Sequence, residues 1–407
     1  LGPGKMLIVD TDEGKVYYND QIKKMVSTQK PYVNWVEENR YNLEDFPAPA
    51  TYTQPDYYNL RMQQRVFAYT YEELHRLVKP MAEQGQEPTS SMGNDVPLAV
   101  LSGQTKLLYN YFKQNFAQVT NPAIDSIREE MVMSLNSYIG GSHNILDENP
   151  GLGRMLLIPH PVLSNSELEQ VRSIKKMSFR SKTIEMVYPY EEKSLEEGLD
   201  DLCKAAEEAV DNGHRLVVIS DRNVSETLVP IPALLSVSAV HHYLIRQEKR
   251  GKIGLIVESG EAREVHHFAL LIGYGACAVN PYLAFESITQ MAISEELRSG
   301  LDSQVASQNY IQAVSKGLKK VFSKMGISTL SSYQGAQIFE AVGLNSELIE
   351  QYFTGTNSAV EGIGLEILEE EIRRRHRFAY ANERRSFLKL ITSGDYAWRE
   401  DAEYHAF

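Results

Sequence analysis

Hydrophobic positions in the middle of the chain alternate between two patterns, which together predict parallel strands connected by helices. From about residue 155 onward, short continuous apolar runs are separated by segments whose apolar residues recur every three to four positions. The predicted strands are MLLIP, KTIEMVYP, RLVVIS, IGLIVES and ACAVNPY. Continuous apolar runs are expected when both faces of a sheet are covered, and strand–helix–strand repetition implies parallel strands. Two architectures fit: an open doubly wound sheet, and a complete or incomplete (β/α) barrel.

Capping signals indicate where several helices begin. Residues 70–73, 164–167 and 194–197 have the spacing of a capping box, in which a hydroxyl and a glutamate each accept a hydrogen bond from a backbone amide. The region before residue 140 is expected to be mainly helical. It would include an apolar helix that ends at residues 120–122 and a second helix that begins there with Asn as cap and Pro in the first turn. Residues 284–380 are also expected to be mostly helical.

Two segments near the N-terminus predict a hairpin and a linker. KMLIVD and KVYY have the character of short strands, joined by the turn residues Asp12-Glu13-Gly14. Residues 41–58 are rich in Pro and Tyr and show no hydrophobic period, so we expect an extended boundary segment there. Its aromatic side chains indicate that it lies along a protein surface.

Composition limits the classes of function that the chain can have. It has 407 residues, 43% of them hydrophobic, and a net charge of −13, which argues against nucleic-acid binding. The basic run RRRHR at 373–377 follows three glutamates at 369–371 and is expected to form a salt-bridged solvent face of a helix. No apolar stretch reaches the length of about 18 residues that a membrane span requires. Cys203 and Cys277 fall in apolar elements and predict buried free thiols.

Several long strings in the chain carry a resemblance to a known family. They are GPGKMLIVDTDEGKV (2–16), MAEQGQEPTSSMGNDVPLAVLSGQTKLLYNYFKQNFAQVTNPAIDSIR (81–128), VESGEAREVHHFALLIGYGACAVNPYLAFE (257–286), KMGISTLSSYQGAQIFEAVGL (324–344), YFTGTNSAVEGIGL (352–365) and the terminal AEYHAF. The second, third and fourth resemble the central domain of the large subunit of glutamine-dependent glutamate synthase. The first resembles the end of its glutamine amidotransferase domain, and the last two resemble the approach to its FMN domain. The resemblance covers essentially the whole chain.

The resemblance implies a fold and a domain organisation. It favours the barrel, so we expect an α/β fold: a degenerate (β/α) barrel-like parallel sheet with helical N-terminal and C-terminal extensions. It implies that residues 1–45 are the tail of the amidotransferase domain, 46–345 the central domain, and 346–407 a helical connection to the FMN domain.

The resemblance also implies a parent reaction. Glutamate synthase makes glutamate reductively from glutamine and 2-oxoglutarate, using FMN and an iron–sulfur cluster, with electrons from ferredoxin or a nicotinamide. Those cofactor residues are expected beyond Phe407, so this chain should bind no cofactor and hold no catalytic residue of its own. Its partners would be the amidotransferase and FMN domains of the same polypeptide, in the bacterial cytoplasm or the plastid stroma, without nucleic acid or membrane.

Polar residues follow three of the predicted strands and define a candidate site. They are Asp221 after RLVVIS, Glu258, Ser259 and Gly260 after IGLIV, and Asn280 after ACAV. The carboxyl ends of parallel strands meet at one edge, where α/β sites form. The last two loops resemble those that hold a flavin phosphate, which supports an alternative function, a stand-alone flavin-dependent barrel oxidoreductase. Acidic side chains in the first loop and a proline in the second speak against that alternative, because they repel phosphate and remove an amide donor.

Two histidine pairs raise the question of a metal. They are His241-His242 and His266-His267, and adjacent residues on a helix point about 100° apart, so neither pair chelates by itself. We therefore predict no metal site and interpret these histidines as core or surface residues.

The resemblance assigns a different role to two loops. Positions that match Met92, Thr120 and Asn121 look like residues of the wall of a tunnel that carries ammonia from the amidotransferase site to the FMN domain. Ammonia has to travel uncharged, because a buried ammonium ion is strongly unfavourable. Without the resemblance, the same residues would be interpreted as ordinary loop and cap residues. A module that only docks the neighbouring domains, with no channel, is a third hypothesis.

Overall fold

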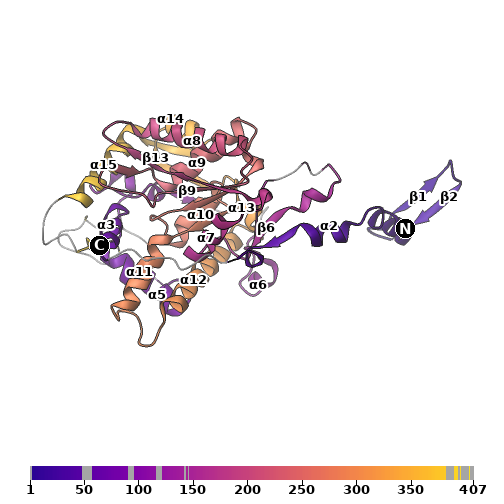
Figure 1. Cartoon of the computed structure of the whole chain (residues 1–407), viewed down its shortest axis with the longest axis horizontal. Helices are drawn as coiled ribbons and strands as arrows, with labels where there is room; N and C mark the ends of the chain where they lie inside the picture. Colours follow the sequence, from indigo (N-terminus) through magenta and orange to yellow (C-terminus); the bar gives the residue numbers. More distant parts are fainter. Residues whose placement is uncertain are drawn as a thin grey trace.

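A mixed α/β body with a long N-terminal arm makes up the described part of the chain (Figure 1). The computed structural model describes residues 2–47, 57–89, 96–115, 122–141, 144, 146–381, 389–392, 395 and 403. Among these residues no helix is both long enough and apolar enough to cross a membrane.

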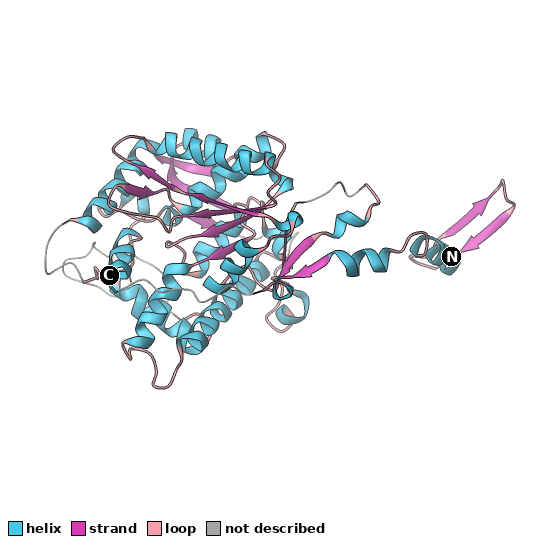
Figure 2. Ribbon diagram, in the orientation of Figure 1, coloured by secondary structure: helices cyan, strands magenta, loops and turns pink. Residues whose placement is uncertain are grey.

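The arm consists of a hairpin, two helices and the first strand of a small sheet (Figure 2). In chain order its elements are β1 (Leu7–Asp10), β2 (Lys15–Tyr18), α1 (Asn19–Ser27), α2 (Tyr32–Asn39), β3 (Arg40–Asn42) and the 3₁₀ helix η1 (Leu43–Asp45). β1 and β2 pair antiparallel, which confirms the predicted hairpin. At its base the arm joins the body through a three-stranded sheet of order β3-β6-β5, made with β5 (Ser137–Ile139) and β6 (Met155–Ile158).

The predicted linker lies against the body where the structure describes it. The rings of Tyr41 and Phe46 pack on Phe179 with centroid distances of 5.3 and 6.2 Å. Aromatic contacts of this kind stabilise beyond the area they bury. The prediction that this segment follows a surface is therefore confirmed for residues 41–47; residues 48–56 lie outside the described part.

A four-stranded parallel sheet forms the centre of the body. Its order is β12-β11-β9-β7, with β7 (Ser181–Glu185), β9 (Leu216–Ser220), β11 (Gly254–Glu258) and β12 (Ala278–Asn280). A short antiparallel pair, β8 (Val187–Pro189) with β10 (Leu228–Pro230), lies beside it. Helices α8 (Leu195–Asp211), α9 (Ala233–Arg246) and α10 (Val265–Gly273) connect successive strands. The predicted strand–helix alternation is confirmed for these four strands, whereas MLLIP, predicted as part of the same series, forms β6 of the separate three-stranded sheet.

Both faces of this sheet are buried, which explains the continuous apolar runs. Alternate residues point to opposite faces of a strand. Val217, Ile219, Leu255 and Val257 belong to the large core. Leu216, Val218 and Ile256 belong to a second cluster, together with residues of β5, β6 and α7 (Asn165–Ser173).

The sheet is not closed into a barrel in the described part of the chain. Its strands follow one another in sequence order, as they do in a barrel, but β7 and β12 remain at opposite edges. The second face is covered by β5, β6 and α7 instead. The coarse prediction of an α/β fold with a parallel sheet is confirmed, whereas the barrel-like closure is not.

Helices surround the sheet, and their starts agree with the capping signals. The three predicted boxes are present at Thr70, Ser164 and Ser194, each with its hydroxyl accepting from the backbone amide three residues later. The other helical elements are α3 (Tyr57–Val66), α4 (Tyr71–Glu73), η2 (Leu74–Val78), α5 (Lys79–Gln84), α6 (Glu129–Val132), η5 (Pro150–Gly153), η6 (Met177–Phe179), η7 (Arg250–Lys252), α11 (Tyr282–Ile293), α12 (Ser303–Lys324), α13 (Leu330–Tyr333), α14 (Ser346–Tyr352) and α15 (Leu365–Tyr380).

Two predictions about helices are wrong. The segment before residue 120 is not one apolar helix but two 3₁₀ turns, η3 (Ala99–Leu101) and η4 (Leu108–Tyr111), followed by strand β4 (Phe112–Gln114). No helix begins at Pro122; residues 122–125 have no regular structure. The polar run Ser102 to Thr105 interrupts the apolar period, and β4 pairs with a strand more than two hundred residues away, which local propensity cannot indicate.

The C-terminal part contains strands that we did not predict. β13 (Phe339–Leu344) pairs with β4 on one side and with β14 (Asn357–Ile363) on the other. The pairing with β14 is parallel and irregular, and a Cβ on Gly362 would lie 2.0 Å from the carbonyl oxygen of Gly343. Two glycines therefore permit this close approach, and both weaken the strand signal in the sequence.

The basic run on α15 is only partly a solvent face. Arg373 forms the expected ion pair with Glu369, at 2.6 Å. His376, however, is buried and contacts the carbonyl oxygen of Ser225 at 2.8 Å. The helix is confirmed, but its basic residues do not all face solvent.

Gly317→Ala should lower the free energy of unfolding by about 1–3 kcal/mol, because overpacking forces neighbours to move. The added methyl on α12 would lie 2.3 Å from Cγ2 of Val265 on α10. Denaturant unfolding measures the effect. Gly251→Ala is the matched control, since its Cβ would meet no atom within 4 Å. An unchanged midpoint in Gly317→Ala would contradict this packing, and adding Val265→Ala should restore part of the loss.

Candidate functional site

The structure brings the three predicted strand ends together at one edge of the sheet. The parallel register places Ser220, Glu258 and Asn280 beside one another. Asp221 then accepts hydrogen bonds from the hydroxyl of Ser259 at 2.6 Å and from the amide of Gly260 at 2.9 Å. The expected neighbours are thus in contact.

Glu258 is the centre of this edge and is held by two arginines. Its carboxylate lies 2.5 Å from Nη2 of Arg172 and 2.7 Å from Nε of Arg222, and it accepts from the hydroxyl of Ser220 at 2.6 Å. Burial alone would raise the pKa of Glu258, but the two arginines outweigh it and lower that pKa. Glu258 is therefore ionised and neutralised from within the chain.

The same arginines leave few unoccupied cations and amide donors that could bind a phosphate at this edge. Arg222 also binds Glu286 at 2.8 Å and stacks over the ring of Tyr282 at 4.1 Å. The amide of Gly260 already donates to Asp221, and a Cβ on this glycine would lie 2.5 Å from the ring of Phe67. The cations and amide donors of a phosphate site are occupied by carboxylates of the chain, so the geometry does not favour the flavin oxidoreductase alternative.

Asn280 and Asp221 complete the polar edge. The amide of Asn280 donates to the carbonyl of Leu163 at 2.8 Å and to Oδ1 of Asn165 at 3.0 Å. Burial raises the pKa of Asp221 to about 8, although the hydrogen bonds from Ser259 and Gly260 act in the opposite direction. Asp221 therefore keeps its proton near neutral pH.

Arg263, which no sequence pattern singles out, fixes the loop before α10 to α3 and α4. Its guanidinium is buried, lies 2.8 Å from Glu73, and donates to the carbonyls of Phe67 and Ala68 at 3.0 Å each. It also lies 4.4 Å over the ring of Tyr69. A lone arginine among glutamates gives no periodic signal, so only the structure reveals this contact.

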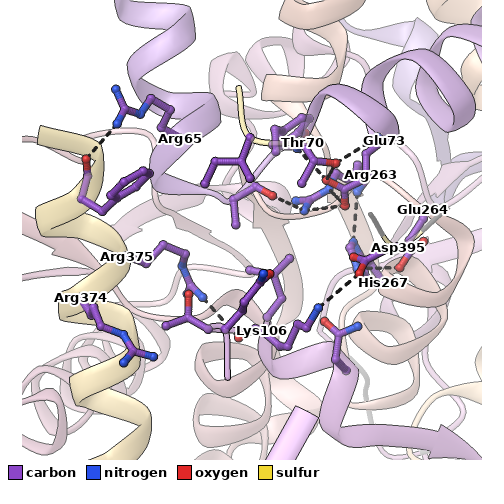
Figure 3. Close-up of a pocket in the computed structure, with 18 of the residues that line it drawn as sticks. Arg65, Thr70, Glu73, Lys106, Arg263, Glu264, His267, Arg374, Arg375 and Asp395 are labelled. Carbon is purple, nitrogen blue, oxygen red and sulfur yellow. Dashed lines mark hydrogen bonds and ion pairs between the residues drawn. The ribbon is translucent and has the colours of Figure 1, made fainter. Parts of the chain in front are cut away.

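A cavity of about 480 Å³ opens beside Arg263 (Figure 3). Its walls come from α3, the 103–107 segment, the loop before α10, and α15. The charged residues that line it are Arg65, Glu73, Lys106, Arg263, Glu264, Arg374, Arg375 and Asp395. Cations outnumber carboxylates among these residues. Arg374 is exposed as predicted, whereas Arg375 is half-buried, and both line the cavity.

The histidine pairs make contacts within the protein. His267 lies 3.0 Å from Glu264 and stacks on the ring of Tyr109 at 4.2 Å. His266 contacts the carbonyl oxygen of Tyr109 at 3.2 Å. Burial lowers the pKa of His241 to about 3, with Arg250 adding to the effect. Within the described residues, no group of three or more potential ligands is placed to hold a metal ion.

The predicted tunnel residues Met92, Thr120 and Asn121 lie outside the described part of the chain. The described residues near them share one neighbour, α12. Lys316 of this helix donates to the carbonyl of Gly85 at 3.1 Å, and Ser323 accepts from the amide of Ile124 at 2.8 Å. The assignment of the three residues to a tunnel stays a prediction.

The cysteines fit their predicted state in part. Cys203 is a buried free thiol on α8, and burial raises its pKa to about 12. Cys277 is also free, but it is only half-buried. The raised pKa of Cys203 is the opposite of the lowered pKa that a reactive thiol requires.

Asp221→Asn should flatten the pH dependence of stability. The unfolded carboxyl, with its usual pKa of 3.8, loses its proton as the pH rises, while the folded one holds it until about pH 8. The unfolded state therefore gains relative stability between these values, and this group should lower the free energy of unfolding by at most about 1.4 kcal/mol per pH unit there.

Denaturant unfolding at several pH values within that window measures the slope. Asp12→Asn, which removes an exposed carboxylate from the hairpin turn, should keep the wild-type slope. Equal slopes for the wild type and Asp221→Asn would contradict the raised pKa.

Comparison with known families identifies two parts of the chain. Residues 62–345 match the model of the glutamate synthase central domain, and residues 1–35 match the class-II glutamine amidotransferases. A mutant flavocytochrome b2 with pyruvate bound is similar with a TM-score of 0.35 at 8% identity, covering 78% of this chain and 90% of that chain. That score is too low to establish a shared fold.

Similar curated proteins extend along the whole chain. The large chain of NADPH glutamate synthase from Bacillus subtilis is 43% identical over 100% of this chain, which covers 26% of that protein. NADH glutamate synthase from Schizosaccharomyces pombe is 37% identical and ferredoxin-dependent glutamate synthase from Pyropia yezoensis 40% identical; the chain covers 20% and 27% of their lengths. The chain thus spans about a quarter of these relatives or less. It belongs to the glutamate synthase central domain family.

Proposed function

We propose that this chain is the part of a glutamate synthase that connects the glutamine amidotransferase and FMN domains and walls part of the ammonia tunnel between them. The parent would be an oxidoreductase that forms glutamate from glutamine and 2-oxoglutarate, with FMN and an iron–sulfur cluster bound elsewhere in the polypeptide. In this proposal the chain acts as scaffold and channel and does not catalyse by itself. Residues 1–45 are the tail of the amidotransferase domain, 46–345 the central domain and 346–407 the connection to the FMN domain.

The N-terminal arm is the observation that carries the connecting role. Leu7, Ile8 and Val9 are consecutive in β1 and are 41%, 47% and 61% exposed. Residues of a strand alternate between faces, so both faces of the hairpin carry exposed apolar side chains. Continuous apolar strands are typical of sheets that are covered on both sides. This arm matches the amidotransferase family, which supports its burial within a neighbouring domain.

The helices of the arm have the same property. Large apolar side chains are exposed on α1 and α2, namely Met25, Val26, Val33 and Val36. A monomer seldom leaves such a series uncovered. The arm projects away from the body in Figure 1, so the body cannot cover it. These features fit a segment whose contacts lie in the preceding domain.

The tunnel proposal rests on the chemistry of the cargo and on the family. Neutral ammonia needs weak hydrogen-bonding partners and no nearby charge, since a carboxylate would favour the trapped ammonium form. Met92, Thr120 and Asn121 offer a thioether, a hydroxyl and an amide. The described residues Gly85 and Ile124 both contact α12, and the three proposed residues lie outside the described part of the chain.

Ile8→Asp and Val9→Asp should each destabilise the amidotransferase domain of the complete polypeptide by several kcal/mol, because each would bury an unpaired charge. Glutaminase activity against temperature measures the loss. Gln29→Asp is the matched control, since it adds the same charge at an exposed polar position of the arm. If only one of the two hairpin variants lost stability, the hairpin would be buried on one face and exposed on the other.

Met92→Trp and Thr120→Val should uncouple the parent enzyme. The first narrows the passage and the second removes a hydroxyl partner of ammonia, so glutamine would be consumed without matching formation of glutamate. The measurement is the ratio of glutamine used to glutamate made. Met131→Trp, at a methionine of α6 that is 80% exposed, is the control and should leave the ratio unchanged. An unchanged ratio in both test variants would instead support a docking module without a channel.

A further inference from the structure

We propose that the cavity between α3, α10 and α15 binds a small oxyanion, a carboxylate or a phosphate, through Arg374 and Arg375. Figure 3 shows Arg375 reaching from α15 towards the segment of Lys106 on the opposite wall. The proposal goes beyond the scaffold and channel role and does not depend on it.

The carboxylates that line the cavity are engaged with other side chains. Glu73 lies 2.8 Å from Arg263, Glu264 lies 3.0 Å from His267, and Asp395 lies 3.4 Å from Lys106. His267 outweighs the effect of burial and lowers the pKa of Glu264 to about 2, so this acid stays ionised in its own pair. None of these three pairs includes Arg374 or Arg375.

Arg375 is a half-buried cation without an ion pair among the described residues. Among the described residues, Nη1 of Arg375 donates one hydrogen bond, to the carbonyl oxygen of Lys106 at 3.3 Å. Burial lowers the pKa of Arg375, and the charges of Glu261 and Glu371 offset that effect only in part. A cation removed from water is costly unless an anion approaches it. An oxyanion in the cavity would supply that anion.

The two nearest acids on that side are held by other donors. Glu371, four residues before Arg375 on α15, accepts from the hydroxyl of Tyr111 at 3.4 Å, and burial raises its pKa. Glu261 accepts from the backbone amide of Ala233, the first residue of α9, at 3.0 Å. Each acid therefore has a contact of its own, and among the described residues neither forms an ion pair with Arg374 or Arg375, although Arg375 lowers the pKa of Glu371 in part.

The shape and lining of the cavity suit a small ligand better than a polymer. A volume of about 480 Å³ lies within the usual range for small-molecule sites. Planar guanidinium groups bind carboxylate and phosphate through paired N–H donors. The amide side chains of Gln104 and Asn110 also line the cavity, and Leu107 and Phe378 provide apolar walls. This combination of forked cations, amides and apolar surface favours a small organic acid or a phosphate compound.

Hydrogen–deuterium exchange of the complete polypeptide tests the proposal locally. Inorganic phosphate and succinate are titrated separately at constant ionic strength, and exchange is followed in peptides that cover 100–110 and 366–380. We expect saturable protection of both peptides by one of the two probes. Protection by phosphate alone assigns the phosphate chemistry, and protection by succinate alone assigns the carboxylate chemistry.

Three substitutions decide whether Arg374 and Arg375 are responsible. Arg375→Gln should raise the half-saturating concentration about tenfold or more, because it removes charge-assisted hydrogen bonds. Arg374→Gln changes an exposed side chain and so tests the site even if Arg375→Gln fails to fold. Arg377→Gln removes the same charge from an exposed position on the same helix, outside the cavity lining, and should bind as the wild type does. If neither probe protects the two peptides, the proposal is overturned. It is also overturned if Arg377→Gln weakens binding as much as Arg374→Gln and Arg375→Gln do.

Discussion

Buried acidic side chains at the C-terminal ends of the parallel strands impose the main constraint on this structure. Asp221, Glu258 and Glu286 are at most 1% exposed there, and ionised carboxylates at such positions are strongly unfavourable unless they are compensated. The chain compensates them by different means. Glu258 and Glu286 are bound by arginines, whereas Asp221 holds its proton and accepts from Ser259 and Gly260. Removing an arginine would leave an unpaired buried charge, and removing a donor of Asp221 would leave a buried oxygen unsatisfied, so the loops around this edge are fixed together.

This compensation has a consequence for function. Carboxyl ends of parallel strands are the usual place for a ligand in α/β proteins, because amide donors and cations can gather there. Here Arg172 and Arg222 already hold anions that belong to the chain. The cavity beside Arg263 is separate from this edge, and its cations include Arg374 and Arg375 of α15. An edge that is internally neutralised is suited to a scaffold, since it keeps its geometry without any cofactor.

Sequence reasoning succeeded where a short segment determines its own structure. The capping boxes at Thr70, Ser164 and Ser194, and the buried strands such as β9 and β11, carry their signals within a few residues. The meeting of Glu258 with Asp221 was also predictable, because parallel strand ends must share an edge. Prediction failed for β4 and β13, which are stabilised by pairing across a long sequence separation. It also failed for Arg375, because a charged residue on a helix looks alike in the sequence whether it faces solvent or a cavity.

The proposed tunnel residues illustrate a deeper limit. A site for an ion or a phosphate is marked by residues that attract it, so its chemistry can be found in a sequence. A passage for neutral ammonia requires the opposite, a wall with weak partners and no charge, and many loops have that composition. Met92 and Thr120 therefore gain their meaning only from the family to which the chain belongs, and no periodicity or spacing singles them out. The exposed apolar arm is different. Leu7, Ile8 and Val9 have the sequence of an ordinary buried strand, but the structure leaves their side chains exposed. Both faces of the hairpin carry exposed apolar side chains, so the observation that supports the proposed connecting role can be read directly from exposure.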